Sequence, residues 1–225
     1  MILEVCANSY ESAINAEKGG AHRIELCENL NVGGITPDYK LASKVISKLK
    51  IPVYVLIRPR AGNFNYSQEE FEQIKKDIRI FKDLGCKGIV SGVLTKDKNI
   101  DIDKTKELIN LSRPLEFTFH RAFDEVLNPI KSLKQLIKLK ADRLLTSGQK
   151  NSAVEGVDLI KELINIGNNR IKIMPGSGIN QTNILEFTKL DIDEIHGSFS
   201  NKLKNPLKVT NVDIILKCIR ILKQH

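Results

Sequence analysis

The sequence predicts a single-domain (β/α)₈ barrel, in which eight parallel strands form the wall and eight helices cover it. Three observations support this fold class. Short β-rich runs alternate with amphipathic helical stretches, eight such pairs fit within 225 residues, and no linker or low-complexity tract divides the chain. A doubly wound open sheet is the alternative, and it is disfavoured because no GxGxxG turn follows the first strand. Residues 1–225 are therefore expected to form one domain.

Eight segments read as strands because they are short, mostly apolar and bounded by glycine, proline or polar residues. Strict alternation with helices requires parallel strands joined by crossover helices. Two of the segments, "AHRIEL" and "ADRLLT", resemble each other four strands apart, but the similarity is too short to establish a repeat. The predicted strands are residues 1–6, 22–27, 52–57, 88–92, 115–120, 142–146, 170–174 and 193–197.

The segments between these strands carry apolar residues at helical spacing and have clear start signals. Asn8 with Glu11 and Ser67 with Glu70 fit capping boxes, and Asn211 can cap the last helix. The predicted helices are about 9–18, 38–49, 67–84, 103–112, 129–139, 153–166, 180–188 and a closing helix at about 211–223.

Composition favours a soluble cytoplasmic protein without membrane contact. Hydrophobic residues make up 41% of the chain, no apolar run approaches 18 residues, and the chain starts in a strand rather than in a basic and apolar leader. The four cysteines are too far apart for a CxxC zinc knuckle and too few for a disulfide scaffold. We therefore expect reduced thiols.

The net charge of +8 arises from 35 Lys and Arg against 27 Asp and Glu. The lysines are scattered over predicted helix faces, aromatic residues make up only 5%, and no nucleic-acid-binding motif is recognised. These observations favour solvated helix surfaces over a nucleic-acid partner.

Polar side chains alternate with apolar ones along several predicted strands. Because alternate residues face opposite sides of a strand, the apolar set packs against the helices and the polar set points into the barrel. Buried charges need partners, so we expect Glu4, Arg23, Glu25 and Arg58 to form an ion-pair network on the barrel axis. The full inward set is Glu4 and Cys6, Arg23, Glu25 and Cys27, Tyr54, Leu56 and Arg58, Thr118 and His120, and Glu194 and His196.

The C-terminal ends of the strands carry the candidate site residues, at the face where barrels place their active and binding sites. Arginines combined with free backbone amides at a helix N-terminus suit an anion, and the seventh and eighth loops of barrels often hold phosphate. The predicted anion-binding residues are Arg23, Arg58, Arg60, Arg121, Ser147, Gly176 and Gly178.

Two of the cysteines are expected to be neighbours. Adjacent strands lie about 4.8 Å apart, so equivalent positions on the first two strands bring Cys6 and Cys27 together. Two close thiolates suit a soft ion such as Cu(I). Cysteine is also among the most commonly buried residues, so core packing is the alternative for this pair. Cys86 and Cys218 are expected to be packing residues.

The motifs "GGAHRIELC", "GGITP", "IPVYVLIRPR", "TFHRAFD", "LTSGQ" and "MPGSGI" resemble those of the copper homeostasis protein CutC family, from residue 1 to about 200. The resemblance implies a (β/α)₈ barrel, generally cytoplasmic and oligomeric, linked to copper tolerance. It also implies Cu(I) binding by the pair matching Cys6 and Cys27. The family loop usually reads Arg-Pro-Arg-Gly-Gly-Asp-Phe, whereas Ala61 and Asn63 stand here, so this chain lacks the acidic side chain.

Two functions remain open. The first is a cytoplasmic protein, a homodimer or higher homo-oligomer, that buffers or transfers Cu(I). The second is an enzyme on a small anionic substrate, phosphorylated or not, with His120 or His196 as acid or base and Glu25 or Asp124 orienting it. On the second interpretation His120 must titrate near neutrality. A non-catalytic scaffold has least support. His22, at the opposite end of the barrel, and the terminal His225 are not site candidates.

Overall fold

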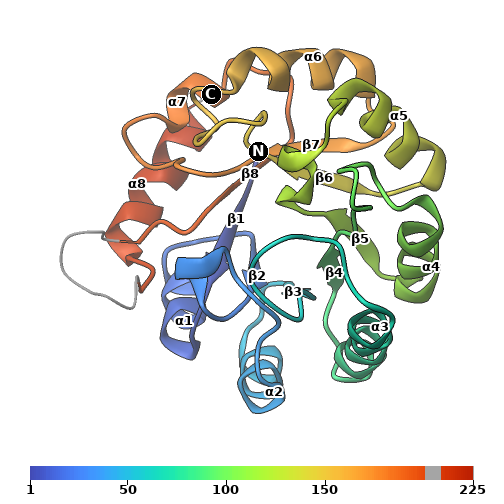
Figure 1. The fold of residues 1–225 in the computed structure, drawn as a ribbon. Helices are drawn as coiled ribbons and strands as arrows, with labels where there is room; N and C mark the ends of the chain where they lie inside the picture. Colours follow the sequence, from blue (N-terminus) through green and yellow to red (C-terminus); the bar gives the residue numbers. More distant parts are fainter. Residues whose placement is uncertain (201–208, 225) are drawn as a thin grey trace.

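Eight parallel strands alternate with eight α-helices in the computed structural model, which describes residues 1–200 and 209–224. The helices lie around the outside of the strands (Figure 1), and the predicted barrel is confirmed. The strands are β1 (Ile2–Ala7), β2 (Arg23–Leu26), β3 (Val53–Leu56), β4 (Gly88–Ser91), β5 (Glu116–Phe119), β6 (Arg143–Thr146), β7 (Lys172–Pro175) and β8 (Glu194–Gly197).

The helices agree with the sequence prediction except near α6 and α7. The predicted helix at 180–188 contains only one turn, and α6 begins four residues later than predicted because residues 147–156 form a loop. Two short 3₁₀ helices, η1 (Leu30–Val32) and η2 (Arg121–Glu125), lie in loops. The α-helices are α1 (Tyr10–Lys18), α2 (Tyr39–Lys48), α3 (Gln68–Asp83), α4 (Ile102–Ser112), α5 (Pro129–Leu139), α6 (Val157–Gly167), α7 (Ile184–Phe187) and α8 (Val212–Lys223).

Side-chain caps explain where several helices begin. Ser67 and Glu70 form the predicted capping box of α3, and Asn211 caps α8 as predicted. The prediction was wrong for α1, where Ser9 rather than Asn8 is the N-cap. Ser9 is extended, and its hydroxyl accepts a hydrogen bond from a backbone N–H in the first turn.

The hydrogen-bonded strand order is β7-β6-β5-β4-β3-β2-β1-β8, so β1 lies between β2 and β8. The register places Cys6 opposite Glu25 and places Glu4 opposite both Arg23 and His196. Strands β7 and β8 contact each other and complete the ring, but no backbone ladder joins them within the described ranges. The first, second and eighth strands therefore bring their inward side chains to one place.

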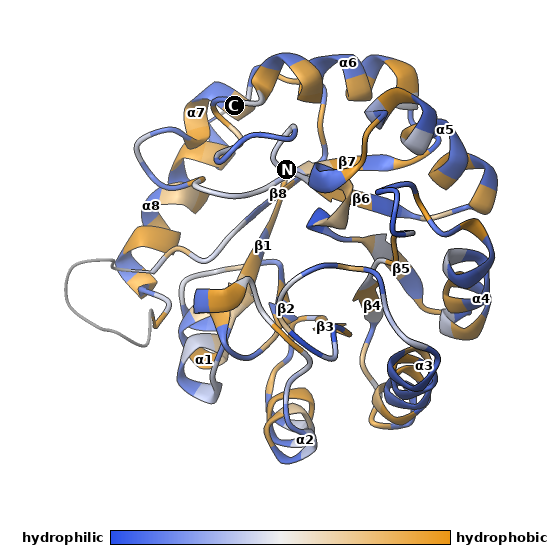
Figure 2. Ribbon diagram, in the orientation of Figure 1, coloured by the Kyte–Doolittle hydropathy of each residue, from blue (hydrophilic) through white to orange (hydrophobic). Residues whose placement is uncertain are grey.

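The main core lies between the strands and the helices. The outward side chains of the first two strands, Leu3, Val5, Ile24 and Leu26, are fully buried. In Figure 2 the strands and the surrounding helices both carry hydrophobic and hydrophilic residues. Burying one such side chain stabilises the fold by about 1.5–3 kcal/mol. No helix in residues 1–200 or 209–224 combines the length and apolar character needed to cross a membrane.

Candidate metal centre and pocket

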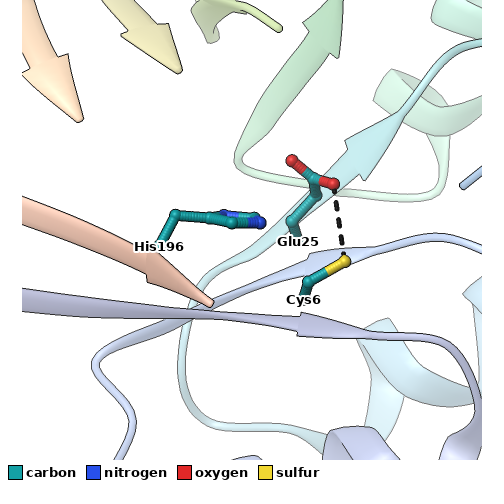
Figure 3. A group of neighbouring side chains, drawn as sticks. All are labelled: Cys6, Glu25 and His196. Carbon is teal, nitrogen blue, oxygen red and sulfur yellow. Dashed lines mark hydrogen bonds between the residues drawn. The ribbon is translucent and has the colours of Figure 1, made fainter. Parts of the chain in front are cut away.

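Three potential metal ligands converge at β1, β2 and β8 (Figure 3). A sulfur of Cys6, a carboxylate oxygen of Glu25 and a ring nitrogen of His196 all lie within 4.8 Å of one another, and the three side chains are buried. It is the only such group of histidine, cysteine and carboxylate ligands in the part of the chain that the structure describes. The strand register explains the convergence, because it aligns Cys6 with Glu25 and brings β8 alongside β1.

The two neighbouring cysteines lie side by side, as the strand positions predicted. Cys6 Sγ is 3.5 Å from Cys27 Sγ and donates a longer hydrogen bond of 3.8 Å to Glu25 Oε1. Cys27 is fully buried in a small cluster with Tyr54 and Leu56. Cys6 lines a pocket, whereas Cys27 does not. The pair therefore presents one sulfur to the pocket and keeps the other behind it.

A hydrogen bond fixes the orientation of His196. Its Nδ1 lies 2.8 Å from Glu4 Oε1, and both side chains are buried. The remaining ring nitrogen, Nε2, is therefore free to face Cys6 and Glu25, toward which the ring points in Figure 3. A histidine held through one nitrogen by a carboxylate is the usual arrangement of a metal-binding imidazole.

The site groups shift one another's proton affinities. The hydrogen bond with Cys27, together with burial, raises the pKa of the Cys6 thiol well above its ordinary value. Burial raises the pKa of Glu25 to about 7. Burial alone would lower the pKa of His196, but contacts with Cys6 and Glu4 outweigh it and raise that pKa well above its ordinary value. Without metal, the structure therefore favours a neutral Cys6 thiol beside a protonated His196 at neutral pH.

Beneath this group, buried charges form a network on the barrel axis. Arg23 Nε lies 2.5 Å from Glu4, and its NH2 group lies 2.5 Å from Glu194. Arg143 pairs with Glu194 and, at 3.1 Å, with Glu116. Burial alone would raise the pKa of Glu4, but the charge of Arg23 and then the contact with His196 outweigh it and lower the pKa to about 2. Glu4 is therefore ionised where it holds His196.

The predicted membership of this network was wrong for Glu25 and Arg58. Neither forms an ion pair in the described residues. Arg58 follows the end of β3, and its guanidinium donates to the backbone carbonyls of Val32 (3.0 Å), Gly34 (2.8 Å) and Gly62 (2.9 Å). It therefore fastens two loops instead of pairing on the axis.

Arg143 takes the place in the network that the prediction gave to Arg58. Its segment "ADRLLT" resembles "AHRIEL", which contains Arg23, and the two strands lie on opposite sides of the barrel. Both arginines donate to Glu194. The weak similarity of these two segments was therefore the sequence feature that could have predicted the place of Arg143 in the network. No such feature pointed to Glu116, which lies at the start of a strand.

The CutC family model matches residues 1–201. The chain belongs to the CutC family. The family protein CutC of Pasteurella multocida is 48% identical over 197 residues, covering 87% of this chain and 81% of that protein. The human copper homeostasis protein cutC homolog is 44% identical over 216 residues, which cover 96% of this chain and 79% of the human protein.

Solved structures agree with this family and fold. The crystal structure of the CutC protein of Streptococcus agalactiae superposes with a TM-score of 0.83 at 33% identity, covering 88% of this chain and 98% of that chain. The structure of KGPDC from Streptococcus mutans has a TM-score of 0.70 at 10% identity, and the superposition covers 99% of this chain and 97% of that chain. The second likeness shows the barrel fold alone.

In this CutC family chain, His120 differs from the sequence expectation. Its Nδ1 accepts a hydrogen bond of 3.2 Å from the Ala122 N–H, and its Nε2 is buried without a partner in residues 1–200 and 209–224. Burial, followed by the charge of Arg58, lowers the pKa of His120 to about 3. This pKa lies far below the near-neutral value that the enzyme interpretation requires of His120, and the ring is neutral with a hydrogen on Nε2.

The carboxylate of Asp124 is fully engaged. It accepts hydrogen bonds from the Thr146 hydroxyl (2.5 Å), the Ser147 N–H (3.0 Å), the Gln149 N–H (3.2 Å) and Arg121 Nε (2.8 Å). These contacts fasten the loop after β6 to η2. A role for Asp124 in orienting a catalytic histidine stays a prediction. In the structure its carboxylate holds this loop in place.

The seven predicted anion-binding residues do not assemble into one site. Only Arg58, Arg121 and Gly178 line the pocket at the end of the barrel. Arg60 instead pairs with Glu70 at 2.5 Å, partly exposed. The other three are Arg23, which lies in the axial network, Ser147, which hydrogen-bonds to Asp124, and Gly176, where an added Cβ would meet Leu145 and His196.

The pocket itself has a volume of about 630 Å³ and adjoins the candidate metal ligands. Its lining includes Cys6, Glu25 and His196 on one part, and Arg58 with His120 on another. Residues 177–181 from the loop after β7, and residues 197–200 at the end of β8 and in the loop after it, line it as well. Sequence reasoning missed the contribution of Gln181, which lies in a loop without strand periodicity. His225 lies outside the described residues.

Proposed function

We propose that this chain binds Cu(I) through Cys6 and Cys27, with His196 as a third ligand, as part of copper homeostasis. The observation that carries the proposal is the placement of two sulfurs 3.5 Å apart beside a carboxylate-held imidazole. Thiolate and imidazole donors suit Cu(I), whereas Mg²⁺ and Ca²⁺ take oxygen ligands. Relatives named copper homeostasis protein support the same assignment.

The spacing of the sulfurs favours a bent rather than a linear site. Two sulfurs 3.5 Å apart, each about 2.3 Å from one ion as in zinc thiolates, subtend an angle of roughly 100°. A linear pair would need a separation of about 4.6 Å. The observed spacing therefore leaves room for a third donor, and His196 Nε2 is the nitrogen available for it.

Binding of the ion requires that the ligands lose their protons. Glu25 Oε1 already accepts the Cys6 S–H, so this carboxylate is placed to receive the thiol proton. Glu4 holds His196 through Nδ1, which keeps the ring oriented when Nε2 is deprotonated. Glu25 is thus assigned a proton-accepting role, because an oxygen donor suits Cu(I) less well than sulfur or nitrogen.

We further propose that the protein acts in the reducing cytoplasm as a homo-oligomer. The four cysteines are unpaired and buried, which agrees with a compartment in which thiols stay reduced. Size-exclusion chromatography with light scattering measures the oligomeric state directly.

The test is competition for Cu(I) against a chromophoric chelator under anaerobic, reducing conditions. Cys6→Ala and Cys27→Ala should each lower the affinity by more than the roughly 10–100-fold that loss of an outer-shell partner causes. Cys86→Ala and Cys218→Ala are matched controls, because both cysteines are buried in the core away from the pocket. Alanine is preferred over serine because it buries no new hydroxyl.

The control variants should retain the wild-type affinity. Equal, weak binding by all five proteins would overturn the proposal and leave Cys6 and Cys27 as packing residues. For the catalytic alternative, His120 is not an available base because it is neutral with a pKa of about 3, and Asp124 is fully hydrogen-bonded. Glu25, with a pKa of about 7, and His196 are the candidates that this alternative retains.

A further inference from the structure

Among the residues that the structure describes, Arg58 is a buried cation without a carboxylate partner. Its side chain is 6% exposed, and the three groups that its terminal nitrogens contact are neutral backbone carbonyls. The other two deeply buried arginines, Arg23 and Arg143, each pair with carboxylates. A buried charge is costly unless it is compensated. Arg58 lines the pocket, and its Nε has no partner in the described residues.

His120 adds a second donor near Arg58. The ring of Phe64 lies 4.9 Å from the His120 ring and 4.8 Å from the Arg58 guanidinium carbon, so both flank the same aromatic side chain. Because Nδ1 of His120 accepts the Ala122 N–H, the ring hydrogen is on Nε2, which is also buried and has no partner in the described part of the chain. The low pKa of His120 agrees with this neutral form.

Two acceptor atoms that have no partner among the described residues belong to side chains lining the same pocket. They are Glu25 Oε2 and Gln181 Oε1. Across the described residues, six buried side-chain polar atoms lack a partner, and four of them belong to residues of this pocket. Buried polar groups are normally hydrogen-bonded, so their concentration at one place indicates a ligand with a complementary pattern of donors and acceptors.

We propose that the pocket binds a small hydroxylated organic anion, whose carboxylate or phosphate group accepts hydrogen bonds from Arg58 Nε and His120 Nε2 and whose hydroxyl groups donate to Glu25 Oε2 and Gln181 Oε1. A volume of about 630 Å³ exceeds what a bare inorganic anion fills. This site is additional to the proposed copper ligands and does not depend on them.

The test is isothermal titration of the copper-free protein in a chelator-containing buffer at constant ionic strength. One arm compares acetate with glycolate and glycerate, and the other compares inorganic phosphate with glycerol phosphate. If the site takes a carboxylate, glycolate and glycerate should bind more tightly than acetate. If it takes a phosphate, glycerol phosphate should bind more tightly than inorganic phosphate. The series whose probes bind identifies the anionic group. Sodium chloride serves as the ionic-strength control. The absence of saturable binding by every probe up to about 20 mM would overturn the proposal.

The decisive variant is His120→Asn, whose side-chain oxygen can still accept the Ala122 N–H but whose amide is too short to replace Nε2. Loss of a hydrogen bond to a charged group should weaken binding by about tenfold or more. His22→Asn is the matched control, because His22 also accepts a backbone N–H, from Leu3 at 3.0 Å, at the opposite end of the barrel. Gln181→Ala should reduce the preference for the hydroxylated probe by about two- to tenfold.

An NMR measurement separates this site from adventitious binding. The imidazole Nε2–H signal of His120 should shift on titration with the hydroxylated anion, whereas the His22 signals should not. Binding that leaves His120 unshifted, or that is equal in His120→Asn and wild type, would place the anion elsewhere and overturn the proposal. Because the protein is copper-free throughout, failure here leaves the copper proposal unaffected.

Discussion

Glu194 is the carboxylate on which the axial network depends, and its removal should strongly destabilise the barrel. It is fully buried and accepts from Arg23, Arg143 and, at 3.3 Å, Lys172. Glu194→Gln keeps the shape but removes the negative charge, which leaves two buried guanidinium groups short of compensation. Removing one partner of a buried ion pair costs about 3–5 kcal/mol. We expect a loss of about 4 kcal/mol in the free energy of unfolding.

Urea denaturation followed by circular dichroism measures this loss. For a domain of about 200 residues, each kcal/mol lost from the free energy of unfolding lowers the melting temperature by roughly 2–4 °C. The melting temperature of Glu194→Gln should therefore fall by about 8–16 °C. Glu107→Gln is the control, because Glu107 is half exposed and pairs with Lys75 on the surface. That pair should contribute less than about 1 kcal/mol.

The effect of Glu194→Gln should depend on pH. Burial alone would raise the pKa of Glu194, but Arg143 and Arg23 outweigh it and lower the pKa. A carboxyl with a lowered folded-state pKa stabilises the protein above its unfolded pKa, and this stabilisation is lost as the pH falls through the folded pKa. The difference in the free energy of unfolding between wild type and Glu194→Gln should be largest near pH 7 and should shrink below about pH 4. A gap under about 1 kcal/mol at neutral pH would refute the reasoning.

Three further predictions follow from single contacts. His120 should stay neutral between about pH 8 and pH 5 in ¹⁵N NMR, because its pKa is about 3, and a midpoint near its ordinary value would contradict this. Ser67→Ala should lower the free energy of unfolding by about 1 kcal/mol through loss of the α3 cap, measured by urea denaturation. Gly176→Ala places a Cβ 2.6 Å from Leu145 and 3.3 Å from His196, so it should weaken Cu(I) affinity in the chelator assay, and an unchanged affinity would argue against His196 as a ligand.

The sequence predicted the strands well because each is a short apolar run between polar segments, a pattern set locally. The start of α1 was misplaced because Asn8 and Ser9 are both good caps, and only the backbone conformation selects Ser9. The helix predicted at 180–188 is mostly a loop because side-chain and backbone hydrogen bonds of Asn180 and Asn183 organise its start.

For the site, neighbouring strand positions were enough to predict that Cys6 and Cys27 lie together, because adjacent strands have a fixed spacing. The partners of the buried charges were harder to predict. Glu194 receives donors from β2 and from β6, and contacts across a barrel are not specified by the alternation of residues within any one strand. Arg58 was misplaced because it lies beyond β3, where the inward and outward pattern no longer applies.

The junction between β7 and β8 is the one place in the described barrel where strands meet without a backbone ladder. Two of the loops that line the pocket, residues 177–181 and 198–200, leave from these two strands. Cys6 and Cys27 belong instead to the fully laddered side, where β1 has a bonded neighbour on each edge. The two sulfurs therefore belong to strands that backbone ladders join on both edges, whereas the pocket loops after β7 and β8 leave from the one junction in the described barrel that no ladder closes.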